Sequence, residues 1–158
     1  MQAPEPIQAS HDVSLFDCGN PLLNDWLKRR ALANHAGGAT RCYVVTHANA
    51  VVAYYAISAG AVAASQATGN VKRNMPDPIP VLVLARLAID RRCQAQGLGK
   101  ALLKNAVQRA MRVARDVGVR ALLVHAIDAS AETFYLKHGF SASLTAPLTL
   151  MLRMSEVG

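Results

Sequence analysis

Cysteine and histidine are too few and too scattered in this sequence to build a scaffold or a metal centre. Cys18, Cys42 and Cys93 are odd in number and form no C-x-x-C pair, which argues against a disulfide framework and against a zinc site. The five histidines show no ligand spacing. We therefore predict free, at least partly buried thiols and no metal ion.

Long hydrophobic runs suited to a membrane are missing as well. Residues 48–64 carry no formal charge, but they are rich in alanine and are interrupted by Asn49, Ser58 and Gly60. A membrane span needs about 20 strongly apolar residues, so this segment predicts buried strands. Residues 1–10 lack the basic and then apolar pattern of a secretory signal. We expect no membrane association and a cytoplasmic location.

The chain does contain enough apolar material for a folded domain. Of its 158 residues, 52% are hydrophobic, a proportion that excludes the polar composition of disordered chains. Because domains commonly span roughly 100–200 residues, we expect a single domain over residues 1–158.

Basic residues are concentrated in one part of the chain. Residues 1–85 hold six basic and five acidic residues, whereas residues 86–158 hold eleven basic and five acidic ones. Within residues 86–120 the count is nine basic against two acidic. A local excess of this kind indicates an anionic partner, either a phosphate-bearing cofactor or nucleic acid, although a solvated basic helix face gives the same count.

The first half of the chain predicts one helix followed by two strands. Asn20-Pro21 is typical of a helix start, and a helical apolar stripe follows as far as Gly37-Gly38. Residues 41–46 and 51–58 are β-branched and aromatic runs that predict adjacent antiparallel strands. Residues 66–80 contain several prolines and predict a loop.

The second half predicts a mixed sheet with helices on its faces. Residues 81–89 are almost continuously apolar, which is typical of a central strand buried on both sides. The remaining predicted elements are helices over 98–117 (stopped by Gly118) and 129–137 (capped by Gly139) and strands over 121–127 and 148–154. The order β-β-β-α-β-α-β then requires one crossover between parallel strands.

Two glycines lie between the predicted central strand and the long helix. In residues 94–101, Gly97 and Gly99 would let the backbone approach a ligand, and the N–H groups of the helix start suit a pyrophosphate. The segment lacks the third glycine of the dinucleotide fingerprint and the Gly-Lys-Ser/Thr of a P-loop. Another kind of phosphate site is therefore indicated.

The segment Gln94-Ala95-Gln96-Gly97-Leu98-Gly99 resembles the acyl-CoA signature of the GCN5-related N-acetyltransferases (GNAT). A second family feature is Phe134-Tyr135-Leu136-Lys137-His138-Gly139-Phe140. The resemblance implies the α/β GNAT fold, a mixed and mostly antiparallel sheet that is splayed at the central strand and flanked by helices. It also implies acetyl-CoA as the co-substrate. The residues implied to bind it are Leu87, Ala88, Ile89, Gln94, Gln96, Gly97, Leu98, Gly99, Lys100 and Ala101.

Four further segments resemble the acetyltransferase toxins of bacterial type II toxin–antitoxin modules, namely residues 16–20, 84–90, 121–126 and 147–152. This resemblance implies acetyl transfer to the α-amino group of aminoacyl-tRNA, which blocks translation. It also implies a ribbon-helix-helix antitoxin that neutralises the enzyme, operator DNA bound only by the toxin–antitoxin complex, and a homodimer.

The predicted central strand lacks a carboxylate that could deprotonate an amine. Near pH 7.5, converting a lysine amine of pKa about 10.4 to its free base costs roughly 4 kcal/mol, whereas an α-amine of pKa about 7.7–8.0 costs under about 1 kcal/mol. The missing base therefore favours an aminoacyl α-amine as the acceptor. Asp90, Asp128, Glu132 or an ordered water are the alternative bases.

Tyr135 is the predicted general acid. In this hypothesis the amine attacks the thioester, backbone N–H groups of residues 87–89 stabilise the oxyanion, and Tyr135 protonates the leaving thiolate. The alternative is that Tyr135 is only a structural aromatic residue of the core.

Arg91, Arg92 and Lys100 are candidates for binding the cofactor phosphates. The candidates for tRNA contacts are Arg29, Arg30, Lys72, Arg73, Arg86, Arg91 and Arg92.

Two other functions compete with the toxin hypothesis. An ordinary GNAT enzyme would act on a small amine or a protein N-terminus, but the missing strand carboxylate and the basic excess argue against it. A non-catalytic module would bind acyl-CoA or nucleic acid, and Tyr135 argues against that.

Overall fold

The computed structural model of the chain describes residues 3–156. Seven strands form one sheet in the order β1-β2-β3-β4-β5-β7-β6. The chain divides into two compact units: residues 3–58 with 85–106, and residues 59–84 with 107–156. Three elements run from one unit into the other, namely β3 (Ala50–Val62), β4 (Ile79–Ile89) and α4 (Leu98–Asp116).

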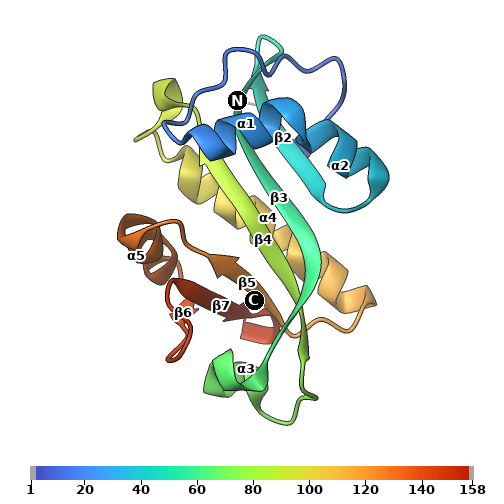
Figure 1. Ribbon diagram of the computed structural model, residues 1–158, viewed down its shortest axis with the longest axis vertical. Helices are drawn as coiled ribbons and strands as arrows, with labels where there is room; N and C mark the ends of the chain where they lie inside the picture. Colours follow the sequence, from blue (N-terminus) through green and yellow to red (C-terminus); the bar gives the residue numbers. More distant parts are fainter. Residues whose placement is uncertain (1–2, 157–158) are drawn as a thin grey trace. The chain divides into compact units, whose positions relative to one another are not determined.

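The first unit contains the N-terminal strands and helices. Besides its parts of β3, β4 and α4, it holds β1 (Glu5–Pro6), α1 (Pro21–Arg29), α2 (Ala31–Gly37) and β2 (Arg41–His47). β2 pairs antiparallel with both β1 and β3, and α2 packs against β2 (Figure 1). The predicted antiparallel pair is therefore confirmed. Ala48 and Asn49, both with positive φ, form the turn between β2 and β3.

The single helix predicted after Asn20 is wrong, because the structure has two. Asn20 does cap α1, since its Oδ1 accepts the N–H groups of Leu22 (2.9 Å) and Leu23 (3.2 Å). At Arg30 the backbone turns to φ −124° and ψ −26°, which ends α1. Neither glycine nor proline marks this break in the sequence, so the apolar period alone could not reveal it.

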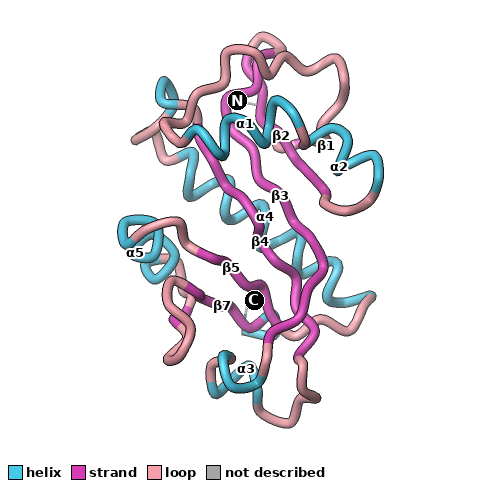
Figure 2. The backbone as a smooth tube through the Cα atoms, viewed as in Figure 1, coloured by secondary structure: helices cyan, strands magenta, loops and turns pink. Residues whose placement is uncertain are grey.

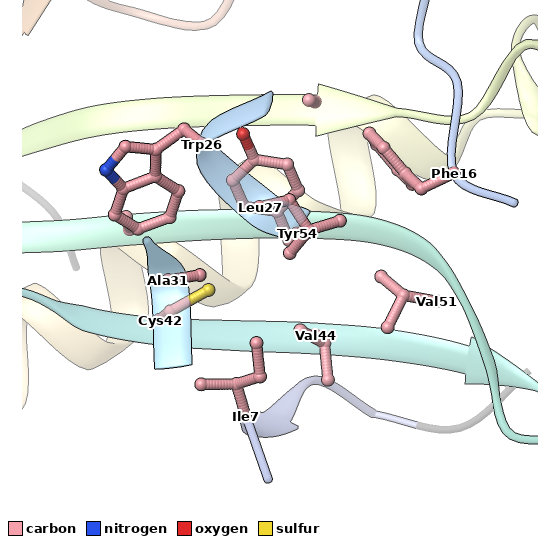
Figure 3. Packing of buried hydrophobic residues seen from close by; sticks show 11 residues of the cluster. Ile7, Phe16, Trp26, Leu27, Ala31, Cys42, Val44, Val51 and Tyr54 are labelled. Atoms are coloured by element: carbon pink, nitrogen blue, oxygen red, sulfur yellow. The ribbon is translucent and has the colours of Figure 1, made fainter. Parts of the chain in front are cut away.

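Two neighbouring tyrosines of β3 anchor helices on opposite faces of the first unit. The ring of Tyr54 stacks on Trp26 (centroids 5.8 Å apart) and its hydroxyl donates to the Leu23 carbonyl (2.7 Å) of α1. The hydroxyl of Tyr55 donates to Asn105 of α4 (2.6 Å). Successive strand side chains point to opposite faces, so α1 and α4 cover different sides of β3. Figure 3 shows the cluster on the α1 side.

The second unit is built on a parallel pair. It contains its parts of β3, β4 and α4 together with α3 (Gly69–Lys72), β5 (Ala121–His125), α5 (Ala129–Lys137), β6 (Ser141–Ala142) and β7 (Thr149–Arg153). β4 pairs with β5 in parallel from Val81–Ala121 to Leu84–Val124. β7 pairs antiparallel with β5 and with β6, and Figure 2 shows β5 and β7 side by side. One parallel pair among antiparallel ones confirms the predicted mixed sheet.

Several boundaries differ from the sequence prediction because burial changes along the elements. The predicted loop over 66–80 contains α3. The strand predicted over 121–127 ends at His125, and Ile127 is exposed. The central strand is not buried on both faces throughout, since Ala85 is exposed. The helix predicted over 98–117 ends at Asp116, and Val117 is exposed.

The two predicted helix stops also differ in detail. Gly118 does not adopt a left-handed conformation, and α4 ends two residues before it. His138 is the cap of α5, and Gly139 follows it with φ +95°. The three cysteines are free, as predicted. None of the helices in the described part of the chain is long and apolar enough to cross a membrane.

Candidate functional site

The predicted cofactor loop lies in the first unit, and Gly97 determines its backbone conformation. After β4 the chain forms a short 3-10 turn (Arg91–Cys93), and Gly97 then takes φ +75° before α4 begins. The Gly97 carbonyl accepts the Ala101 N–H (3.2 Å), which starts the helix. A Cβ added to Gly97 would meet nothing within 4 Å. Glycine therefore sets the conformation and leaves open space beside the helix start.

Electrostatics at this helix start suit an anion. The first turn of the 19-residue helix α4 contains no acidic residue, and the helix dipole places partial positive charge there. Lys100 is exposed and forms no ion pair within residues 3–156. The N–H groups of the first turn and Lys100 can therefore face a phosphate.

Glutamine side chains stabilise the loop itself. The Gln94 Nε2 donates to the carbonyls of Ile89 (2.9 Å) and Cys18 (3.2 Å). The Gln96 Nε2 lies 3.4 Å from the Arg92 carbonyl, to which it donates. The structure thus gives Gln94 a loop-shaping role that the motif alone did not indicate.

Asp90 is a buried anchor of the loop. Its carboxylate accepts the N–H (2.9 Å), Nε (2.8 Å) and Nη2 (3.0 Å) of Arg92 and the N–H of Asp17 (3.0 Å). The hydrogen bonds from Arg92 lower the pKa of Asp90 to about 2. A carboxylate of so low a pKa is a poor base, so Asp90 is removed from the candidate bases. The Nε–Nη2 edge of Arg92 is likewise occupied.

The side chain of Arg91, which follows β4, packs against residues 17–19, the segment before α1. Its Nε lies 3.1 Å from the position that a Cβ of Gly19 would take, and its Nη1 is 3.9 Å from Asp17 Oδ2. The side chain is still 65% exposed. Arg91 is therefore oriented by the N-terminal segment while it remains accessible to an anion.

Residues of β4 divide between two faces. The Arg86 guanidinium lies 4.3 Å from the centroid of the Trp26 ring, and Ala88 belongs to the same buried cluster. Because strand side chains alternate, Leu87 and Ile89 point to the other face, where both are half-buried. Arg86, a candidate tRNA contact from the sequence, thus packs on Trp26 of α1.

Tyr135 lies in the second unit, on α5. Its side chain is 6% exposed, between the rings of Phe134 (5.3 Å) and Phe140 (5.5 Å). Burial raises the pKa of Tyr135 to about 12. Within the part of the chain that the structure describes, no group forms a hydrogen bond with its hydroxyl. The proton is thus held at neutral pH and is not committed to another residue.

Two pairs of basic residues lie on separate elements. Arg29, in α1, forms an exposed ion pair with Asp25 (3.4 Å), and Arg30 follows it. Lys72 and Arg73 end α3 in the second unit, where both are exposed. The predicted cofactor residues are thus all in the first unit, whereas Tyr135, Lys72 and Arg73 are in the second.

Sequence reasoning missed a further arginine, Arg120. Its Nε donates to the Val71 carbonyl (3.0 Å), and its Nη2 donates to the carbonyls of Asn70 and Arg73 (3.1 Å each). The unpaired carbonyls at a helix end are suited to such a cation. Arg120 therefore holds the end of α3, and no local pattern around residue 120 signals this.

The other candidate bases differ in their engagement. Asp128 caps α5 by accepting the Ala131 N–H (2.8 Å). Glu132 is half-buried in the first turn of α5. Among residues 3–156 there is no group of three or more His, Cys, Asp or Glu side chains that could hold a metal ion.

A family model described as an acetyltransferase (GNAT) domain matches residues 38–142. This chain belongs to the GNAT acetyltransferase family. The predicted family and fold are therefore confirmed, and the matched range includes residues 94–101.

Relatives of known function resemble the chain over nearly its whole length. A tRNA-acetylating toxin of Mycobacterium tuberculosis is 47% identical over 154 residues, which cover 98% of this chain and 93% of the relative. The solved structure of AtaT complexed with acetyl-methionyl-tRNAfMet matches with a TM-score of 0.90 at 27% identity, covering 98% of this chain and 96% of that one.

Two further structures show related proteins with other partners. A tyrosine-to-phenylalanine mutant of AtaT, bound to the C-terminus of the antitoxin AtaR and to acetyl-CoA, matches with a TM-score of 0.83 at 27% identity. A KacTA–DNA complex matches with a TM-score of 0.83 at 28% identity. Both matches cover 98% of this chain and 94% of the other.

Proposed function

We propose that this GNAT protein is the toxin of a type II toxin–antitoxin module. It transfers acetyl from acetyl-CoA to the α-amino group of aminoacyl-tRNA and thereby inhibits translation. The observation that carries this proposal is the 47% identity, over nearly the whole chain, to a tRNA-acetylating toxin. An identity of that extent includes the parts of the chain outside the acyl-CoA motif.

The loop of the first unit fits the phosphates of acetyl-CoA. The open side of Gly97, the N–H groups of residues 97–101 and Lys100 supply donors and positive charge without an opposing carboxylate in the first helical turn. Arg91 adds an accessible guanidinium. Acetyl-CoA supplies the activated acetyl thioester when it is bound.

Tyr135 is the proposed general acid. Its hydroxyl retains a proton because burial raises its pKa to about 12, and it would donate that proton to the thiolate that leaves. The amine proton passes to water or to a weak base such as Glu132. We further propose that N–H groups of residues 87–89 stabilise the oxyanion.

The scarcity of general bases supports an α-amine as the acetyl acceptor. Asp90 is held as an ionised carboxylate by Arg92, and β4 itself contains no Asp or Glu. An α-amine of pKa about 8 needs little help to deprotonate at neutral pH, in contrast to a lysine amine. Aminoacyl-tRNA presents such an amine, and the exposed Arg29, Arg30, Lys72 and Arg73 would contact its phosphates.

Partners and location complete the proposal. The AtaT–AtaR and KacTA–DNA structures support a neutralising antitoxin and operator DNA bound through the toxin–antitoxin complex. We propose that this antitoxin is a ribbon-helix-helix protein and that the toxin is a homodimer. A cytoplasmic location follows from a tRNA substrate.

The test is acetyl transfer from radiolabelled acetyl-CoA to separate acceptors. Purified protein is offered a total aminoacylated tRNA pool, the same pool after deacylation, and a panel of peptides and small amines. We expect label only with charged tRNA, and none with Tyr135→Phe. Label on peptides or small amines, with charged tRNA unlabelled, would instead establish an ordinary GNAT enzyme.

A further inference from the structure

Three consecutive residues before α1 contact the acyl-CoA loop, although more than 70 positions separate them in the sequence. The Asp17 N–H donates to Asp90 Oδ2 (3.0 Å), and the Asp17 carbonyl accepts the Arg91 N–H (2.9 Å). The Cys18 carbonyl accepts Nε2 of Gln94 (3.2 Å). Each contact ends on a residue of the turn that leads from β4 to Gly97.

Gly19, the third residue, leaves room for the Arg91 side chain because it has no Cβ. It adopts φ +93°, and a Cβ at this position would lie 3.1 Å from Arg91 Nε and 3.3 Å from Nη2. These distances are shorter than ordinary van der Waals contact, so a Cβ at residue 19 would push the guanidinium away by a few tenths of an ångström. Only glycine both adopts this backbone conformation without strain and leaves Arg91 in place.

The segment is itself anchored to α1. Asn24 of α1 accepts the Cys18 N–H (2.9 Å) through Oδ1 and donates through Nδ2 to Asp17 Oδ1 (3.0 Å). Asp17 Oδ1 also accepts the Gly19 N–H (2.9 Å). The carboxylate therefore shapes its own segment through one oxygen, while the other faces Arg91 (3.9 Å).

We propose that residues 17–19 are a positioning segment for acyl-CoA, in which Gly19 and Asp17 hold the Arg91 guanidinium in the orientation that binds a cofactor phosphate. The inference rests on the proposed binding of acetyl-CoA at this loop and is independent of the acceptor. Asp17 and Gly19 do not touch the cofactor; they act through Arg91.

The decisive measurement is the affinity of the purified protein for acetyl-CoA by calorimetry, without any acceptor. Gly19→Ala should raise the Kd a few fold, because the shifted guanidinium makes a weaker charge-assisted contact. Gly38→Ala is the matched control: Gly38 also has positive φ (+81°), but nothing lies within 4 Å of its added Cβ. Both variants should lose similar thermal stability, whereas Gly38→Ala should change the Kd by less than twofold.

A double-mutant cycle tests whether the effect passes through Arg91. Arg91→Ala alone should raise the Kd about tenfold, and adding Gly19→Ala should then change it little further. Independent, multiplicative effects of the two substitutions would overturn the proposal. In steady-state assays, Gly19→Ala should raise the KM for acetyl-CoA while the KM for the acceptor stays unchanged.

Asp17→Asn provides a second test of the positioning role if Gly19→Ala does not fold. It retains an oxygen for Gly19 and loses the negative charge opposite Arg91, so we expect a rise in Kd of a few fold that shrinks at high salt. An unchanged Kd in both variants, with wild-type protein binding acetyl-CoA, would refute the positioning role alone. Failure of the wild-type protein to bind acetyl-CoA would refute the proposed function as well.

Discussion

Replacement of Asp90 by asparagine tests the stability of the loop most directly. The carboxylate is buried and accepts four hydrogen bonds, three of them from Arg92. Its pKa falls from 3.8 to about 2 in the folded protein. At about 1.36 kcal/mol per pKa unit, this difference contributes about 2 kcal/mol to the free energy of unfolding at neutral pH.

The sign of the pH dependence follows from the lowered pKa. A carboxylate whose folded pKa lies below its unfolded value contributes its full stability above pH 4, and that contribution is lost as the pH falls towards 2. The difference between wild type and Asp90→Asn should therefore be about 2 kcal/mol at pH 7 and roughly half of that at pH 3. For a chain of this length, 2 kcal/mol corresponds to a fall in Tm of about 4–8 °C.

Urea unfolding followed by the fluorescence of Trp26 provides the assay. Trp26 is the only tryptophan and is buried in the core of the first unit. Asp25→Asn is the control, since its carboxylate is 63% exposed and pairs with an exposed Arg29; we expect a change below about 0.5 kcal/mol. Equal stability of Asp90→Asn and wild type at pH 7, or a difference that does not shrink at pH 3, would refute the reasoning.

Three further predictions concern the reaction. Tyr135→Phe should leave the Kd for acetyl-CoA unchanged and lower kcat by about 10²–10⁴; equal turnover would remove Tyr135 from the mechanism. In a kcat–pH profile the rate should rise as the acceptor amine loses its proton and should not fall again below about pH 11, because burial holds the pKa of Tyr135 near 12; a descending limb near pH 9 would identify a different acid. Charge reversal at Arg29 and Arg30, or at Lys72 and Arg73, should raise the KM for charged tRNA and flatten its dependence on salt, and an unchanged salt slope would place the tRNA elsewhere.

The glycine loop could be recognised from the sequence because its chemistry is local. Gly97 lies between a strand and a helix, and the left-handed turn it makes needs only its immediate neighbours. The start of α1 is local in the same way, since Asn20 caps residues two and three positions away. The break at Arg30 follows from no such local signal.

The roles of individual side chains around the loop could not be predicted in the same way. Gln94 was assigned to the cofactor by its motif, yet its amide also binds the Cys18 carbonyl. Asp90 was a candidate base until its hydrogen bonds to Arg92 and to the distant Asp17 were known. Whether a carboxylate is a base or an anchor depends on the donors that folding brings to it.

The sequence by itself determined the family, the position of the glycine loop and most of the elements, because each of these depends on short motifs or on the period of apolar residues. Tertiary structure alone decided that Asp17 and Gly19 orient Arg91, that Arg86 stacks on Trp26 and that Arg120 holds α3. These contacts join residues 47 to 74 positions apart, and such pairs carry no periodic or local signal. Their energies arise only when the folded chain excludes water around them and supplies each charge with its partner.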